Sequence, residues 1–329
     1  MTKSTFQYGY RIVGDCTGVR RLVNHAAAFA AYARCDAKAE VEREAYLSAF
    51  TFGQDFREHL DRLATTKGFA GECSAPVLWW DIDRAGDLPR AQADAGRLAA
   101  ALVERYGIPD EDVMLFFSGS KGFHVGLPLS FWTPPPSADF HRIARRVCEM
   151  IAAEAGVEID TGIYDKVRAF RAPNSLHPKT GLHKRRVMLA DVLHQSTAEI
   201  LAQAKQPAPF DIPAPSADDA HADRLAADWQ AAVGLVRAEG QARAARHAAG
   251  NDSPTLNRQT VEFIRNGDAV AVGDRHRLLF SAATNLAEYG CPPALAHALL
   301  TEAGLDTGLS PSEVRRQIDC GLEHKEVTL

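Results

Sequence analysis

Two carboxylates one residue apart, Asp81 and Asp83, end an apolar run at residues 75–83. Alternate residues of a strand face the same side, so both carboxylates can converge on one site while Ile82 points into the core. Hard divalent cations such as Mg²⁺ prefer carboxylate oxygens. A solvated strand end has the same pattern, but the run Val77-Leu-Trp-Trp80 indicates a buried strand that delivers both acids to an edge. The pair is therefore a candidate metal site.

A second group of polar side chains lies in residues 118–124, which read Ser-Gly-Ser-Lys-Gly-Phe-His. Two glycines, one of them Gly122, allow the backbone to approach a ligand closely. Lys121 offers positive charge, and Ser118 and His124 offer hydrogen bonds, a combination suited to phosphate. Taken alone, the segment favours the alternative interpretation, a glycine-rich hairpin with its histidine on the inner face of a strand.

A third segment begins at Asp160, and the stretch from Asp160 to Leu189 is basic and rich in turns. Between residues 166 and 186 there are seven Lys or Arg residues and no acid. A positive stretch beside three carboxylates can hold a metal ion, a triphosphate and a polyanionic strand together. A solvated basic face is the alternative, and the neighbouring acids argue against it.

Taken in order, these three segments resemble the motifs of archaeo-eukaryotic primases. Asp81-Ile-Asp83 is similar to the first motif, and Ser-Gly-x-x-Gly-x-His at 118–124 is similar to the second. Asp160 resembles the third aspartate of the small primase subunits. The stretch Arg171-Ala-Pro-Asn-Ser-Leu-His-Pro-Lys-Thr-Gly181 resembles their Pro-x-Ser-Leu-His-x-Lys-Thr-Gly stretch. The matches cover residues 81–181, which is most of the expected catalytic domain.

The resemblance implies a role for each matching residue. Asp81, Asp83 and Asp160 correspond to catalytic carboxylates that hold two Mg²⁺ or Mn²⁺ ions. The residues expected to bind the nucleotide are Ser118, Lys121, Gly122, His124, Arg171, His177 and Lys179. Lys179 is the weakest of these candidates, because it can also simply decorate the turn.

Two positions depart from the family pattern. Ser120 stands where some members have a basic residue, which predicts a weaker grip on the triphosphate. Asp165 is a second candidate for the third carboxylate. Asp160 is preferred because it follows Ile159, as in the apolar-Asp pattern of the family.

The resemblance implies a DNA-dependent primase or polymerase that makes short RNA or DNA primers on a single-stranded template by two-metal nucleotidyl transfer. The expected partners are single-stranded DNA and nucleoside triphosphates, with a replicative helicase or initiator as a further candidate. Three alternatives stay open: a primer-extending repair polymerase of the same superfamily, a non-catalytic replication initiator or single-strand binder, and a metal-dependent nuclease. The clustered acids argue against a non-catalytic protein, and the phosphate-binding inventory of 118–124 argues against a nuclease.

The elements expected to position these residues alternate along the first 205 residues. Aromatic and β-branched runs predict strands, and apolar residues at helical spacing predict helices. The predicted strands cover 8–13, 46–52, 75–83, 113–117, 123–127 and 186–190, and the predicted helices cover 26–32, 56–64, 91–106 and 137–155. The resemblance implies an RNA-recognition-like mixed sheet fused to an N-terminal α/β unit.

A proline-rich stretch predicts the domain boundary. Four prolines within residues 207–215 resist helix and sheet and predict a linker at 206–216. Residues 1–205 are expected to form an α/β (α+β) catalytic domain that folds alone, and residues 217–329 an all-α domain. Helices are predicted there over 218–249 and 275–289, from Pro292-Pro293, and after a capping box at Ser310.

The helical domain is similar to modules attached to primases of plasmids and phages, which help bring template and initiating nucleotides together. The generic helical pattern of 217–329 is equally typical of a small packing bundle without such a role. Its one distinctive piece is Gly273-Asp-Arg-His-Arg277.

The composition excludes several classes of protein. A hydrophobic share of 46% and a charged share of 24% are ordinary for a globular chain. The net charge of −5 argues against binding nucleic acid by bulk charge but allows a local basic groove. The six scattered cysteines predict neither a disulfide framework nor a structural zinc site. The start lacks the apolar core of a signal peptide, and no run of about 20 apolar residues occurs, so the sequence predicts a cytoplasmic protein without membrane spans.

Overall fold

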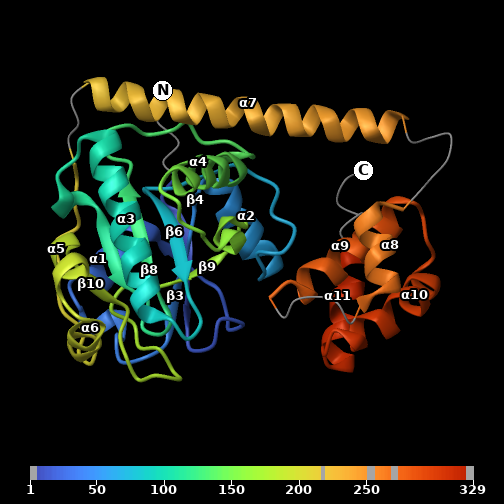
Figure 1. Ribbon diagram of the computed structural model, residues 1–329, viewed down its shortest axis with the longest axis horizontal. Helices are drawn as coiled ribbons and strands as arrows, with labels where there is room; N and C mark the ends of the chain where they lie inside the picture. Colours follow the sequence, from blue (N-terminus) through green and yellow to red (C-terminus); the bar gives the residue numbers. More distant parts are fainter. Residues whose placement is uncertain (1–5, 216–218, 250–255, 268–272, 324–329) are drawn as a thin grey trace. The chain divides into compact units, whose positions relative to one another are not determined.

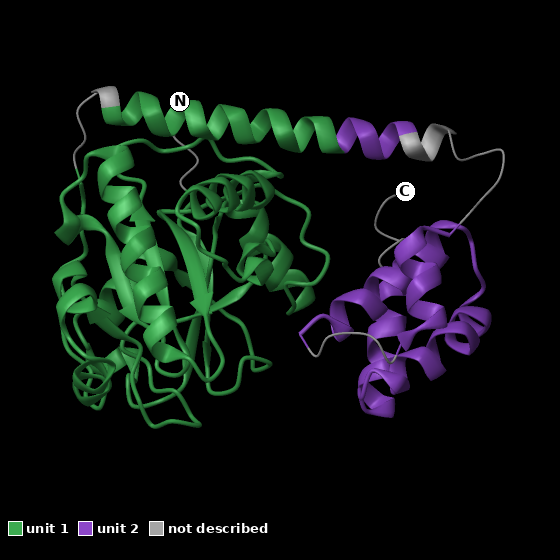
Figure 2. Ribbon diagram, in the orientation of Figure 1, with its two compact units in different colours: residues 1–239 green, residues 240–329 purple. Residues whose placement is uncertain are grey.

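The computed structural model describes residues 6–215, 219–249, 256–267 and 273–323. The chain divides into two compact units, Met1–Glu239 and Gly240–Leu329 (Figure 2). The first unit contains two β-sheets and several helices. In the described part of the second unit every regular element is a helix.

The first sheet of the first unit is antiparallel and is built largely from the N-terminal strands. Its order is β5-β4-β1-β3-β9, with β2 paired to β1. Alternation along β1 turns Tyr10 and Ile12 into the core. Helices α1 and α2 pack on this sheet. The bounds are β1 (Tyr8–Val13), β2 (Arg21–Asn24), β3 (Ala45–Ser48), β4 (Thr51–Phe52), β5 (Cys73–Ser74), β9 (Ala169–Arg171), α1 (His25–Ala33) and α2 (Gln54–Leu63).

The second sheet has the order β10-β7-β8-β6 and is also antiparallel (Figure 1). Helices α3 and α4 both pack against β6. The side chain of Asp87 accepts a hydrogen bond from Arg90 N–H and begins α3, and Gly107 in the left-handed conformation ends it. The bounds are β6 (Val77–Asp83), β7 (Met114–Phe117), β8 (Gly122–Pro128), β10 (Arg185–Val187), α3 (Leu88–Tyr106) and α4 (Phe140–Glu154).

The α+β character and the helical C-terminal region predicted from the sequence are confirmed, with two differences in the sheets. A mixed sheet was expected, but every strand pairing in the described residues is antiparallel. The strand expected over 186–190 ends at Val187, and α5 (Leu189–His194) begins directly after it. The Asp191 carboxylate accepts a hydrogen bond from Met188 N–H at 2.8 Å, which stabilises this helix start.

Short elements complete the first unit. The sequence indicated none of the short strands β2, β5 and β9. The remaining pieces are the 3₁₀ turns η1 (Ala37–Ala39), η2 (Asp110–Asp112) and η3 (Thr161–Tyr164), and the helix α6 (Thr197–Gln203).

The boundary between the units lies inside α7 (Asp219–Ala249) and differs from the linker predicted at 206–216 (Figure 2). The prolines do exclude regular structure from residues 206–215, yet Phe210 N–H donates to Ala33 O at 2.9 Å. Farther on, Trp229 of α7 is buried in the same core as the strands. Because apolar side chains after residue 205 complete that core, the first unit extends to Glu239.

The described part of the second unit is a small helical assembly with its own core. Leu279, Leu300, Val314 and Ile318 are among its buried side chains. The capping box predicted at Ser310 is confirmed, because its Oγ accepts from Glu313 N–H at 3.3 Å while Ser310 N–H donates to the Glu313 carboxylate at 2.9 Å. The helices are α8 (Arg258–Arg265), α9 (Arg275–Glu288), α10 (Pro293–Asp306) and α11 (Pro311–Glu323), of which α8 was not predicted. None of the helices in the described ranges has both the length and the apolar character needed to cross a membrane.

Candidate active site

The acid pair lies at the end of β6. Asp81 and Asp83 are partly exposed, while Ile82 between them is fully buried, as strand alternation requires. The neighbouring strand β8 pairs Asp81 with His124 and Asp83 with Gly122. Both acids and the phosphate-binding candidates therefore meet at one end of the second sheet.

Asp160 lies along the other edge of β6. Its backbone N–H donates to Asp81 O at 2.8 Å, and Tyr164 Oη donates to Trp79 O at 2.7 Å. The Asp160 carboxylate accepts a hydrogen bond from Gly162 N–H at 2.7 Å, which begins η3. The segment carrying the third carboxylate is thus fastened to the strand that carries the first two.

The charge on Asp81 is strongly disfavoured by its surroundings. Burial, followed by repulsion from Asp83 and from Asp160, raises the pKa of Asp81 from 3.8 to about 7, although Lys184 and Lys121 act in the opposite direction. Asp81 Oδ1 is buried and has no hydrogen-bond partner among the described residues. A carboxylate in this state is a strong candidate for a cation ligand.

Asp81 and Asp83 fit Mg²⁺ or Mn²⁺, because both offer hard carboxylate oxygens and one of these oxygens is buried without a partner. Lys121 Nζ lies 2.8 Å from Asp83 Oδ2. This contact does not prevent Asp83 from binding a metal ion, because the exposed lysine side chain can turn away. Over the described ranges, no group of three or more His, Cys, Asp or Glu side chains is arranged to hold a metal ion. Asp160 contributes to the charge of the site, because it repels the negative charge on Asp81.

The hairpin between β7 and β8 presents the phosphate-binding candidates. Ser118 N–H donates to Gly122 O at 2.9 Å and closes the turn, in which Gly119 has φ +92°. A Cβ at Gly122 would overlap Ile82 O and lie 2.5 Å from Asp83 Oδ1. Glycine at this position lets the hairpin lie directly against the acid pair.

His124 projects from β8 toward the acids. Its Nε2 lies 3.4 Å from Asp81 Oδ1, and its ring lies 4.4 Å from that of Phe170. Burial, with smaller contributions from Lys184 and Arg171, lowers the pKa of His124 well below its usual value. His124 is therefore a neutral imidazole that can donate or accept a hydrogen bond.

The first sheet contributes the opposite wall. Arg171 of β9 donates through Nη2 to Tyr46 Oη at 3.1 Å and lies 3.6 Å from the Glu44 carboxylate. His177 follows in the loop after β9, where its Nδ1 accepts from Lys179 N–H at 3.3 Å. The two sheets thus bring side chains far apart in sequence to one place.

These residues enclose a cavity of about 190 Å³. Seven of the ten predicted site residues line it: Asp81, Asp83, Ser118, Lys121, His124, Arg171 and His177. Asp160, Gly122 and Lys179 lie outside its lining. Asp160 is exposed and hydrogen-bonded to the backbone of Asp81, Gly122 is paired with Asp83, and Lys179 lies on an exposed turn. Tyr46, Ser120, Ile163, Arg168, Ala169 and Phe170 complete the lining.

The sequence did not single out Lys184, which lies beneath the cavity and is only 1% exposed. Its Nζ donates to Arg171 O at 2.9 Å and lies 4.3 Å from the Phe170 ring centroid and 5.0 Å from those of Trp79 and Phe116. Burial lowers its pKa well below the usual value. The sequence showed Lys184 only as one member of the basic run, and nothing in that run indicated that its side chain is buried.

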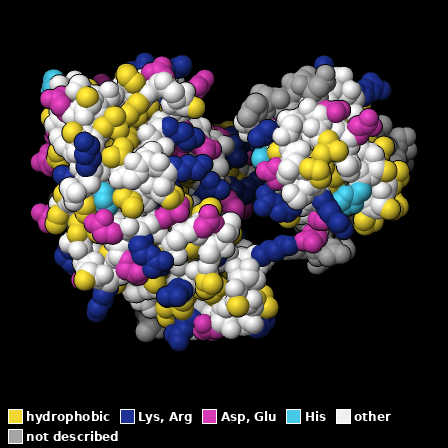
Figure 3. Space-filling model, turned by 90° about the horizontal axis from the view of Figure 1, so that it is seen from below, with side chains coloured by type: hydrophobic (Ala, Val, Ile, Leu, Met, Phe, Trp, Pro, Cys, Tyr) yellow, Lys and Arg dark blue, Asp and Glu magenta, His cyan; other side chains and the backbone are white. Residues whose placement is uncertain are grey.

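The basic run has both exposed and structural members. Lys184 is buried, and Lys166 and Arg186 donate to backbone carbonyls. Arg168 and Arg171 line the cavity. On the first unit, the left-hand body of Figure 3, Lys and Arg side chains lie together with Asp and Glu side chains beside them.

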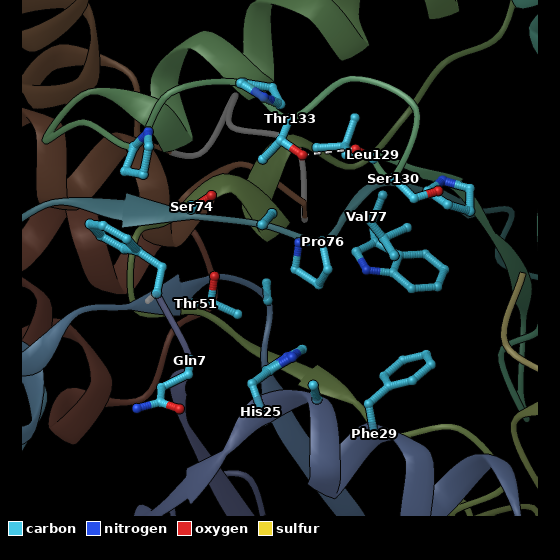
Figure 4. Close-up of a pocket in the computed structure, with 18 of the residues that line it drawn as sticks. Gln7, His25, Phe29, Thr51, Ser74, Pro76, Val77, Leu129, Ser130 and Thr133 are labelled. Carbon is cyan, nitrogen blue, oxygen red and sulfur yellow. Dashed lines mark hydrogen bonds between the residues drawn. The ribbon is translucent and has the colours of Figure 1, made fainter. Parts of the chain in front are cut away.

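A larger cavity, of about 910 Å³, opens at the beginning of β6, where Val77 and Pro76 lie (Figure 4). Its walls are mostly apolar, with Phe29 and His25 on one side and Leu129 on another. No Lys or Arg is among its lining residues, all of which are described. Size alone would favour this cavity as the ligand site, but it lacks the cationic side chains that bind a triphosphate. The smaller cavity has them.

No protein-family model matches the chain, and no curated protein matches its sequence. Among solved structures, the crystal structure of primase RepB' aligns with 13% sequence identity and a TM-score of 0.35, covering 98% of this chain and 91% of that one. This likeness is too distant to assign a fold or an activity to the chain.

Proposed function

We propose that this protein is a primase-like nucleotidyltransferase that uses divalent metal ions. One observation carries the proposal: a partly buried acid pair, a glycine-rich hairpin with Lys121 and His124, and Arg171 from a second sheet all line a single cavity. Carboxylates suit divalent ions, and Lys, Arg and hydrogen-bond donors suit phosphates. A nucleoside triphosphate combines both requirements in one ligand.

Asp81 and Asp83 would hold the metal, with Asp160 adding negative charge beside them. When bound, Mg²⁺ or Mn²⁺ supplies activation of the attacking hydroxyl and neutralisation of the leaving pyrophosphate. Lys121 turns from Asp83 toward the triphosphate, and Arg171 pairs with its phosphate oxygens from the opposite wall. Neutral His124 donates a hydrogen bond to a phosphate oxygen from the floor of the cavity. Ser118, Gly122 and His177 complete this pocket, and Lys179 extends it at the rim.

The finer parts of the proposal concern the template and the context. The chain would copy single-stranded DNA from nucleoside triphosphates, on a catalytic sheet of RNA-recognition type, and serve replication of a plasmid or phage. A replicative helicase or initiator is the proposed protein partner. The helices of the second unit would support initiation of new strands.

The deciding experiment is incubation of the protein with unprimed single-stranded DNA, labelled nucleoside triphosphates and Mg²⁺ or Mn²⁺. Labelled oligonucleotides of increasing length are expected. Extension of an annealed primer without de novo products would indicate a primer-extending polymerase of the same superfamily. Shortening of the strand would indicate a nuclease, and strand binding without synthesis would indicate a non-catalytic protein.

Two substitutions make the experiment specific. Asp83→Ala removes half of the metal-binding pair and is expected to lower synthesis by about 10²-fold or more. Asp61→Ala is the matched control, because this exposed acid lies in α2, outside the cavity lining and outside the candidate carboxylates. Retention of more than about a tenth of the activity in Asp83→Ala would contradict the assignment.

A further inference from the structure

Arg84 directly follows the acid pair and makes four hydrogen bonds through its guanidinium. Nε and Nη2 donate to Asp94 Oδ2 at 2.9 and 2.6 Å. Nη1 donates to Asp83 O at 2.9 Å, and Nη2 also donates to Glu158 O at 2.9 Å. The Arg84 side chain is only 12% exposed and that of Asp94 only 4%.

These acceptors belong to three separate elements. Asp83 ends β6, Asp94 lies in α3, and Glu158 lies two residues before Asp160 in the segment that runs along β6. One planar group therefore joins the backbone that carries the acid pair to the backbone that carries the third carboxylate, and it fixes both to a helix.

The Asp94 carboxylate is the anchor that holds the Arg84 guanidinium in place. Two donors of the guanidinium converge on one oxygen of the Asp94 carboxylate, and hydrogen bonds between charged groups are stronger than those between neutral ones. Arg97 also contacts the Asp94 carboxylate, so the anchor is held from two sides. A lysine offers a point charge without this planar fork and cannot reach all three acceptors at once.

We propose that Arg84 is a positioning residue that fixes the separation between the Asp81/Asp83 pair and Asp160. Without it, the described ties between the two segments are Asp160 N–H to Asp81 O and Tyr164 Oη to Trp79 O. The consequence for metal binding rests on the proposed function, whereas the positioning itself is a property of the protein alone.

The chain offers a matched control in Arg105, which also joins α3 to other elements. Its Nε and Nη2 donate to Asp228 at 2.8 and 2.6 Å, and its Nη1 donates to Glu154 at 2.6 Å. None of these partners lies beside a candidate catalytic carboxylate. Arg105→Lys therefore removes a similar joint at a different place.

Hydrogen exchange of the metal-free protein tests the positioning directly. In Arg84→Lys the amide of Asp160 is expected to exchange at least about tenfold faster than in the wild type, because loss of one charge-assisted hydrogen bond shifts a local opening equilibrium by that factor or more. In Arg105→Lys this amide is expected to exchange as in the wild type. Equal exchange in all three proteins, or equal acceleration in both variants, would overturn the proposal. Asp94→Asn, which keeps the shape of the anchor and removes its charge, gives a second variant with the same expected direction if Arg84→Lys does not fold.

Calorimetric titration with Mn²⁺ tests the consequence for the site. The wild type and Arg105→Lys are expected to bind Mn²⁺ alike, and Arg84→Lys at least about tenfold more weakly. Equal Mn²⁺ affinity in Arg84→Lys and the wild type would overturn the inference while leaving the proposed function intact. Failure of the wild type to bind Mn²⁺ would instead overturn the proposed function, and the exchange experiment would still decide the role of Arg84.

Discussion

Burial of Asp81 beside Asp83 and Asp160 makes its negative charge costly in the metal-free protein. Its pKa of about 7, raised from 3.8 chiefly by burial, means that the folded protein keeps a proton here that the unfolded chain has already released. A bound cation would neutralise this charge and remove its free-energy cost, so the unfavourable charge favours metal binding.

The raised pKa predicts a pH dependence of stability. Between about pH 4 and pH 7 the folded state binds more protons than the unfolded state at Asp81, so the free energy of unfolding falls as pH rises through this window. Asp81→Asn removes the effect and should stabilise the metal-free protein by about 2–4 kcal/mol above pH 7. Below pH 4 it should change stability little. Urea unfolding of both proteins across this pH range is the measurement, and parallel curves would contradict the prediction.

Substitutions of cavity residues should weaken nucleotide binding, whereas substitution of an exposed lysine outside the cavity should not. Lys121→Ala, His124→Ala and Arg171→Ala are each expected to weaken triphosphate affinity about tenfold or more, because each removes a hydrogen bond to a charged phosphate. Affinity for a single strand should change far less. Anisotropy titrations with labelled triphosphate and labelled DNA measure both.

Lys205→Ala is the matched control for those titrations, because Lys205 is exposed, lies outside the cavity lining and is not among the candidate site residues. Its triphosphate affinity is expected to match that of the wild type. Unchanged affinity in all three cavity variants would mean that the hairpin and Arg171 are structural.

At the residue scale, the spacing of residues in the sequence was enough to predict those site residues whose geometry depends only on their close neighbours in the chain. The Asp81/Asp83 alternation and the glycine-rich 118–124 segment could be read directly, because strand geometry and glycine freedom act over a few residues. Lys184 and Arg84 could not, because the burial of Lys184 depends on contacts with residues as distant in the sequence as Trp79, and the acceptors of Arg84 include Glu158. A sequence shows the charge of such groups but not what they touch.

At the scale of elements, the β7–β8 hairpin depends on Gly122. Gly122→Ala places a Cβ against Ile82 O, so β8 must move away from β6 beside Asp83. A destabilisation of about 1–3 kcal/mol is expected from this overpacking, together with loss of synthesis. Denaturant unfolding and the incubation assay measure the two effects.

Gly234→Ala provides the comparison for Gly122→Ala. Gly234 lies in α7 with nothing within 4 Å of its added Cβ. It is expected to stabilise the protein by about 0.5–1 kcal/mol, as alanine does in helix interiors. A similar gain in Gly122→Ala would show that the hairpin tolerates a side chain.

Long periodic elements were predicted well and short ones were not. The apolar run that became β6 and the stripe that became α3 carry their pattern over 7 and 19 residues. The strand predicted over 46–52 is broken into β3 and β4, and β5, with only 2 residues, is too short to show any period and was not predicted. The strand expected over 186–190 ends early because α5 begins at Leu189, where the Asp191 carboxylate caps the helix start.

For the whole molecule, the decisive element is α7, which completes the core of the first unit. Trp229→Ala is expected to cost about 3–5 kcal/mol, because the ring is buried and lies 4.7 Å from that of Phe140. Leu235→Ala, in the same helix but 47% exposed, should change stability little. Equal effects of the two substitutions in denaturant unfolding would mean that α7 adds nothing to the core.

The unit boundary also predicts how a truncated protein behaves. Residues 1–239 should fold alone and extend an annealed primer, since they contain the cavity and the complete first core. They should start new strands poorly, because initiation must hold two free nucleotides and a template together, a cost that an added module offsets. Comparison of de novo synthesis with primer extension, at equal concentrations of the full chain and the fragment, measures this. Equal loss of both activities would limit the second unit to structural support.

The place of Trp229 in the chain also orders events during protein synthesis. Ribosomes deliver the chain from its N-terminus at about 5–20 residues per second. Both sheets leave the ribosome first, but the core beside Phe140 stays open until Trp229 follows. The first unit therefore closes late, and until residues 206–239 have emerged its apolar surface is accessible to chaperones.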